Sequence, residues 1–191
     1  MNLFRYYYFF LKKISNWTNW VISLVLFLIS YFLINGDAFG SGYIRQITGG
    51  VDILDLYFYY PPQKVYEVLG LLGEAGRNAY LTVNLMDFFY PIIYTAFFCI
   101  SMCLTYTFIY PPESKRNWLL LLPLVTLLAD YGENICIRNM LLNYPTQLQG
   151  FPLAATLLTP LKTTLLVVVL LLILQGNIKV TNKLFSKKKP K

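Results

Sequence analysis

The sequence predicts an all-α membrane protein, built as a four-helix transmembrane bundle, and two observations support this fold class. Hydrophobic residues make up 57% of the 191 residues, charged residues only 13%, and the mean hydropathy is +0.52. A soluble domain carries about 25% charged residues, so this chain lacks the polar surface to cover itself in water. In addition, four apolar stretches reach the roughly 20 residues that a helix needs to cross a bilayer. We interpret the chain as a single polytopic membrane domain.

The four predicted spans cover about residues 17–34, 79–110, 118–137 and 151–174. Trp17 and Trp20 open the first span, where tryptophan is typical of the membrane interface. The second span is too long for one straight crossing, so we expect it to tilt, to kink at Pro91, or to begin outside the bilayer. The first span resembles a signal peptide in length and flanking charge. No small-residue cleavage motif follows it, which favours an uncleaved anchor.

The distribution of basic residues predicts the orientation of the spans. Cytoplasmic flanks of membrane proteins are enriched in Lys and Arg. The N-terminal tail, the loop between spans two and three, and the tail 175–191 contain eleven of the 16 basic residues: Arg5, Lys12, Lys13, Lys115, Arg116, Lys179, Lys183, Lys187, Lys188, Lys189 and Lys191. Both termini are therefore predicted to be cytoplasmic, in a cell membrane or bacterial inner membrane.

The same asymmetry accounts for the net charge of +7 without any nucleic-acid partner. The basic tail is expected either to contact anionic lipid headgroups or to act as a topology signal alone. Membrane lipids are thus the first partners that the sequence predicts.

Residues 35–78 form the predicted extracytoplasmic segment. Within it, Pro61 and Pro62 precede a predicted amphipathic helix over 63–72, whose apolar residues recur at helical spacing. We expect this helix to lie on the outer surface or to cap the bundle. The aromatic stretch 51–60 fits either a strand or a helical turn beside the membrane, and residues 4–10 fit a short in-plane helix on the cytoplasmic face.

Several classes of site are excluded by residues that the chain lacks. It contains no histidine, which excludes His-ligated metals and His-based catalytic triads. Phosphate-binding glycine motifs are also absent, so the sequence predicts no cofactor and no metal. Cys99, Cys103 and Cys136 fall within predicted spans without a CxxC motif and are expected to be small buried hydrophobes.

Ionisable residues inside the spans are the most informative feature of the sequence. Such residues are costly in a bilayer and normally face the interior of the bundle. Residues 130, 133, 134 and 138 share one helical face because of their spacing. Alternating span directions bring Asp87, and Lys162 after a kink expected at Pro160, to a similar depth. The sequence therefore predicts a polar cluster in the outer leaflet half, formed by Asp87, Asp130, Glu133, Asn134, Arg138 and Lys162, with Glu74 and Arg77 just above it.

Two interpretations of this cluster stay open at the level of sequence. In the first, the acids Asp87, Asp130 and Glu133 pair with basic residues of the cluster, namely Lys162, Arg138 and Arg77. Buried ion pairs of this kind fix the packing of the helices more than they stabilise it. In the second, the cluster lines a cavity that binds a headgroup, an ion or a substrate, with two carboxylates sharing a proton.

Three functions follow from these interpretations. The leading expectation is an accessory, scaffold or assembly subunit that contacts partner membrane proteins, or further copies of itself, through its helices and outer segment. The alternative is a membrane-embedded lipid-binding protein or enzyme that uses the polar cluster and therefore requires a cavity. A small transporter or channel ranks third, because four helices leave only a narrow pore and the halves show no inverted repeat. No residue spacing specifies a reaction, so an enzymatic activity is left open.

Overall fold

The computed structural model describes residues 3–187, and in this range the regular secondary structure is entirely helical, with no β-strand. The elements, in order, are α1 (Leu3–Ile14), α2 (Trp17–Asn35), α3 (Ser41–Ile47), the 3-10 turn η1 (Leu54–Leu56), α4 (Pro62–Leu71), α5 (Gly73–Met86), α6 (Tyr90–Ile109), the 3-10 segment η2 (Lys115–Leu121), α7 (Leu122–Asn143) and α8 (Phe151–Lys187). The predicted all-helical fold is confirmed. Four helical stretches of the described chain are long and apolar enough to cross a membrane.

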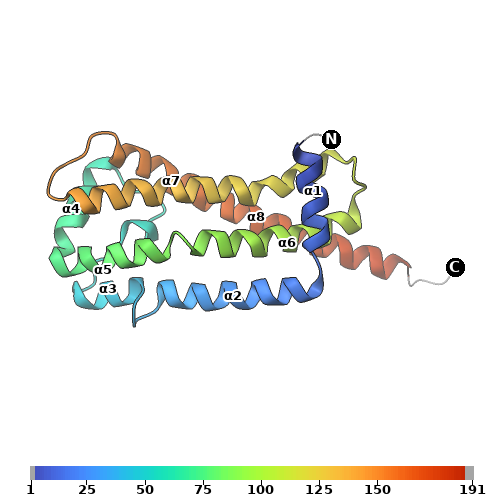
Figure 1. The fold of residues 1–191 in the computed structure, drawn as a ribbon, viewed down its shortest axis with the longest axis horizontal. Coiled ribbons are helices and arrows are strands. Elements are labelled where there is room, and N and C mark those ends of the chain that lie inside the picture. The colour runs from blue at the N-terminus through green and yellow to red at the C-terminus, as the bar shows by residue number, and fades with distance from the viewer. Residues whose placement is uncertain (1–2, 188–191) are drawn as a thin grey trace.

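The long helices lie side by side along one axis, and the short ones gather at the two ends (Figure 1). Helices α2, α7 and α8 run along the axis, as does α5 followed by α6. Helix α1 lies across one end, which we call the α1 end, while α3 and α4 lie at the opposite, α4 end. The last turns of α8 extend past the α1 end, an arrangement compatible with the predicted placement of both termini on one side. Residues 188–191 of the predicted basic tail lie outside the described residues.

The predicted second span is divided into two helices. Helix α5 ends at Met86 and α6 begins at Tyr90, so the helix breaks before Pro91 rather than kinking at it. Pro91 lies in the first turn of α6, where its missing N–H is not needed. In the break, the carbonyl of Asp87 accepts a hydrogen bond of 2.9 Å from Nδ2 of Asn134. A side chain of α7 thus satisfies a backbone group that the break exposes.

The third and fourth predicted spans are shorter than the helices that contain them. Helix α7 continues to Asn143, and its first part is preceded by the 3-10 segment η2. Helix α8 continues to Lys187, well beyond the predicted limit of residue 174, and Pro160 lies inside it without ending it. The boundaries of the apolar stretches therefore underestimate the helices, because their polar ends continue outside the apolar window.

The segment between α2 and α5 packs onto the bundle at the α4 end. The predicted helix over 63–72 is α4, and its predicted apolar face is at most 3% exposed: Val65, Val68, Leu69 and Leu72. The stretch 51–60 forms a helical turn rather than a strand, with Leu54 and Tyr60 buried. These residues join Ile137 and Met140 of α7 in one hydrophobic core.

A second hydrophobic core lies toward the α1 end. There, Tyr8 and Leu11 of α1 pack with Phe98 and Met102 of α6 and with Val169 of α8. All three cysteines are buried and free of disulfides. Along α7 and α8 the residues between the two cores include the predicted polar cluster, so polar side chains separate two apolar regions.

Candidate functional site

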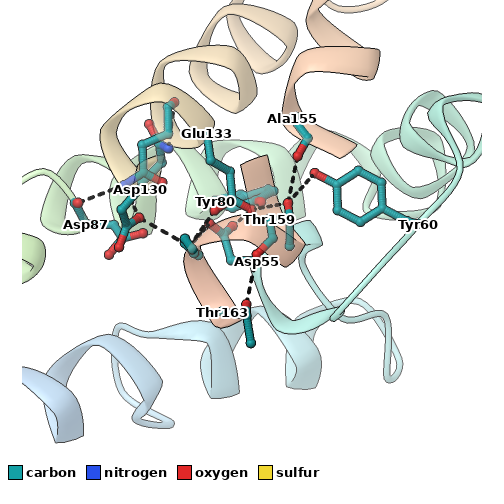
Figure 2. A network of polar contacts seen from close by, with 12 residues as sticks. Asp55, Tyr60, Tyr80, Asp87, Asp130, Glu133, Ala155, Thr159 and Thr163 are labelled. Atoms are coloured by element: carbon teal, nitrogen blue, oxygen red, sulfur yellow. Dashed lines mark hydrogen bonds and ion pairs between the residues drawn. The ribbon is translucent and has the colours of Figure 1, made fainter. Parts of the chain in front are cut away.

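Lys162 of α8 is the centre of the polar cluster. Its Nζ lies 2.5 Å from Oε2 of Glu133, 3.2 Å from Oδ1 of Asp130 and 3.9 Å from Oδ1 of Asp55. The side chain is almost completely removed from solvent, with 8% of the residue exposed. Three carboxylates, two from α7 and one from η1, therefore converge on one ammonium group (Figure 2).

Glu133 is held on the side of the cluster that faces α8. The hydroxyl of Thr159 donates a hydrogen bond of 2.5 Å to Oε1 of Glu133, and the hydroxyl of Tyr60 lies 3.2 Å from that of Thr159. Glu133 and Thr159 are both fully buried. Burial raises the pKa of Tyr60, so its hydroxyl stays protonated at neutral pH. Both oxygens of Glu133 are thus engaged within the protein.

Asp130 of α7 contacts side chains of both α6 and α8. Its Oδ2 accepts a hydrogen bond of 2.7 Å from the hydroxyl of Tyr94 in α6, and its Oδ1 accepts one of 3.2 Å from Asn134. Asn134 also binds the carbonyl of Asp87, and its own carbonyl accepts a hydrogen bond from Nδ2 of Asn84 in α5. This chain of contacts positions the α5–α6 break against α7.

Asp55 and Asp87 are the less completely compensated acids of the cluster. Asp55 accepts a hydrogen bond from the hydroxyl of Tyr80 at Oδ2, whereas its buried Oδ1 accepts none. Asp87 is 8% exposed, yet no cationic side chain among residues 3–187 lies within 4.0 Å of its carboxylate. Uncompensated charge of this kind is costly in a low-dielectric surrounding.

A cavity of about 310 Å³ opens beside these two acids. This volume is at the lower end of the range of small-molecule sites, about 300–1,000 Å³. The polar part of the lining includes Asp55, Tyr80, Asn84, Asp87, Tyr94, Asp130 and Lys162. The apolar part comes mainly from α2, α6 and α8 and includes Phe27, Ile34, Phe98, Leu166 and Leu170. The cavity is therefore apolar along its walls and polar where it meets the cluster.

The structure brings together five of the eight residues predicted for the cluster: Asp87, Asp130, Glu133, Asn134 and Lys162. The remaining three do not join it. Glu74 is exposed at the start of α5. Arg77 donates to the carbonyl of Leu69 at 2.9 Å and lies over the ring of Tyr144, 4.0 Å from its centroid.

Arg138 forms no ion pair with the acids of the cluster, and its Nη1 is buried without a hydrogen-bond partner among the described residues. The expected pairing of the acids with Arg77 and Arg138 is therefore absent, and Lys162 is the one cation that contacts them in the described part of the chain. For Arg138 the reason is geometric, since eight residues along a helix separate it from Asp130 by about 12 Å.

Several members of the network were not predicted from the sequence. Asp55 lies between Leu54 and Leu56 in an apolar stretch, and a carboxylate flanked in this way was a usable signal for burial. Tyr60, Tyr80 and Tyr94 carried no such signal. The chain contains 16 tyrosines, and a tyrosine near a membrane interface is ordinarily explained as part of an aromatic belt.

The centre of the cluster is occupied by a side-chain cation. Among the residues that the structure describes, no group of three His, Cys, Asp or Glu side chains is placed to hold a metal ion, and the point where three carboxylates converge is filled by Lys162. Comparison with models of protein families, with curated proteins and with solved structures found no match to this chain. Its function is therefore inferred from the geometry of the site.

Proposed function

We propose that this protein is a membrane-embedded binding protein that holds an amphipathic, lipid-like molecule in the cavity beside Lys162. The observation that carries the proposal is the cavity itself, with apolar walls from α2, α6 and α8 and a polar region formed by the buried cluster. Such a lining complements a molecule with a hydrocarbon body and a small polar group.

The polar region supports binding rather than packing alone. A cluster that served only to fix the helices would have each charge paired inside the protein. Glu133 and Asp130 fit that description, because each contacts Lys162 and a hydroxyl group. Asp87 does not fit it, since its carboxylate lines the cavity without a cation within 4.0 Å. A bound polar group would supply the missing partner.

The opening of the cavity supports a ligand that arrives from the bilayer. Tyr31 of α2 and Leu170 of α8 line the cavity and are 45% and 51% exposed. We infer that the cavity opens between these two helices, on a surface that lipid chains would contact if the four long helices span a membrane. An amphipathic molecule could then enter sideways with its polar group leading.

The accessory-subunit function, which the sequence placed first, predicts a fully salt-bridged cluster with no cavity beside it and an apolar helix face left for a partner. The cavity therefore favours the binding function over it, while contacts with partner membrane proteins stay a second proposal. No observation on the described residues favours a transporter or channel.

The proposal is tested by filling the cavity. We expect Leu166→Trp, in the cavity wall, to remove most of a specific lipid-like molecule that co-purifies with the wild-type protein in native nanodiscs, as measured by mass spectrometry of extracts. Leu171→Trp is the matched control, because Leu171 is 58% exposed and does not line the cavity. Equal co-purification from wild type and both variants, or none from any, would overturn the proposal.

A further inference from the structure

Two hydrogen-bond acceptors in the lining of the cavity have no partner in the described part of the chain. Oδ1 of Asp55 and Oδ1 of Asn84 are buried without a hydrogen-bond partner among the described residues, and both residues line the cavity. Asn84 is only 1% exposed. It precedes Asp87 by three residues, so the two side chains lie on the same side of the chain at the end of α5.

The hydroxyl donors that contact the acids of the lining, and the ammonium group of Lys162, are already used. The hydroxyl of Tyr80 donates to Asp55 and that of Tyr94 to Asp130. The ammonium group of Lys162 is shared among three carboxylates. Beside the cluster, a ligand that needs donors, such as a phosphate or a carbonyl compound, would therefore have to displace an existing contact, whereas a ligand that brings donors would find free acceptors.

The charge of the site leads to the same conclusion. Four carboxylates, those of Asp55, Asp87, Asp130 and Glu133, lie around a single cationic side chain. An anionic ligand would add a like charge to this surrounding, and beside a neutral one the excess acids would have to be neutralised by protons instead. A cationic ligand would lower the cost of burying the acids.

We propose that the ligand is an amphipathic amine whose protonated nitrogen carries at least one N–H, with the Asp87 carboxylate as its counter-ion and Oδ1 of Asn84 as a hydrogen-bond acceptor. This inference rests on the proposed function, since it names the chemical class of the molecule that the cavity holds. The rings of Tyr90 and Tyr94 also line the cavity, and aromatic faces attract cations. A quaternary ammonium would keep that attraction but leave the two acceptors without a donor.

The test compares three ligands of equal chain length: decylamine, decanol and decyltrimethylammonium. Binding is measured by isothermal titration calorimetry to the full-length protein in phosphatidylcholine nanodiscs, with empty nanodiscs subtracted. Because hydrogen bonds to charged groups are stronger than those to neutral ones, we expect decylamine to bind at least about tenfold more tightly than either other ligand. Equal affinity of decylamine and decyltrimethylammonium would overturn the N–H requirement.

Variants assign the preference to particular residues. We expect Asp87→Asn and Asn84→Leu each to remove most of the advantage of decylamine over decanol. Asp37→Asn is the matched control, because Asp37 is exposed outside the cavity and its loss removes one negative charge in the same way. If Asp87→Asn does not fold, the ligand series on the wild type and on Asn84→Leu decides the outcome.

The outcomes separate this inference from the proposed function. If decanol binds the wild type as tightly as decylamine, and Leu166→Trp abolishes both, the cavity binds amphipathic molecules and the amine specificity is wrong. If none of the three ligands binds and nothing co-purifies with the wild type, both proposals fail.

Discussion

Lys162 is the residue on which the charge balance of the cluster depends. It contacts Glu133, Asp130 and Asp55, and all four residues are shielded from solvent within a predominantly apolar bundle. Removing one partner of a buried ion pair leaves the other charge uncompensated, which typically costs about 3–5 kcal/mol. Here the loss of one cation would leave several acids in that state.

We therefore predict that Lys162→Met lowers the free energy of unfolding by about 3 kcal/mol or more. Unfolding in mixed detergent micelles, followed by circular dichroism, measures the change. In the double variant Lys162→Met/Glu133→Gln one of the uncompensated carboxylates is also neutralised. We expect it to be more stable than the sum of the two single variants predicts, because the two residues interact directly. Strict additivity would contradict the direct role of the ion pair.

Single residues also show where sequence reasoning succeeds. The spacing of Asp130, Glu133 and Asn134 places them on one helical face, and the alternating direction of the helices brings Asp87 and Lys162 to the same depth. Helical periodicity was sufficient for the first three residues, whereas Asp87 and Lys162 also required the order and direction of the helices. It carries no information about Asp55, because the path of an irregular segment depends on which surface it packs against. The break that presents Asp87 to α7 also depends on a tertiary contact, the hydrogen bond from Asn134.

At the scale of elements, helix lengths were harder to predict than helix existence. All four apolar stretches correspond to helical segments of the structure, the second of them as two helices, because long apolar runs leave few alternatives to a helix in a bilayer. Their ends were misplaced, since α7 and α8 continue into sequence that is more polar. In these terminal turns, backbone hydrogen bonding rather than apolar content decides where the helix ends.

The close packing of α6 against α8 depends on a glycine. A Cβ atom at Gly176 would lie 2.6 Å from Oγ1 of Thr105, a buried and stiff β-branched side chain of α6. At Gly132 of α7 a Cβ atom would lie 3.0 Å from Cδ1 of Leu158, which is the end of a flexible side chain and can move aside. The two glycines thus differ in what their replacement would displace.

We predict opposite effects for the two alanine substitutions. Replacing a helical glycine by alanine gains about 1 kcal/mol in helix propensity, and overpacking costs about 1–3 kcal/mol. Gly132→Ala should therefore leave the midpoint of thermal unfolding unchanged or raise it, whereas Gly176→Ala should lower it. If both variants shift the midpoint equally and upward, α8 does not approach Thr105 as closely as described.

At the scale of the whole molecule, basic residues gather at the α1 end. At the α1 end, Lys179 and Arg116 each donate a hydrogen bond of 3.0 Å to the hydroxyl of Tyr110. Both hydrogen bonds lower the pKa of Tyr110, and the one from Lys179 has the larger effect. Lys12 and Lys13 lie in the last turn of α1, at the same end of the molecule (Figure 1). Such a concentration of basic residues is typical of a cytoplasmic face.

This asymmetry predicts which loops can be labelled from outside an intact cell. Single cysteines at Gln149, in the exposed loop between α7 and α8, and at Glu113, in the exposed loop before η2, report on opposite ends of the molecule. We expect Gln149→Cys to react with a membrane-impermeant maleimide on intact cells, and Glu113→Cys to react only after permeabilisation. The native cysteines are at most 9% exposed, so the parent protein is the background control. The opposite labelling pattern would contradict the predicted orientation. It would mean that the basic α1 end lies outside the cell, against the positive-inside rule.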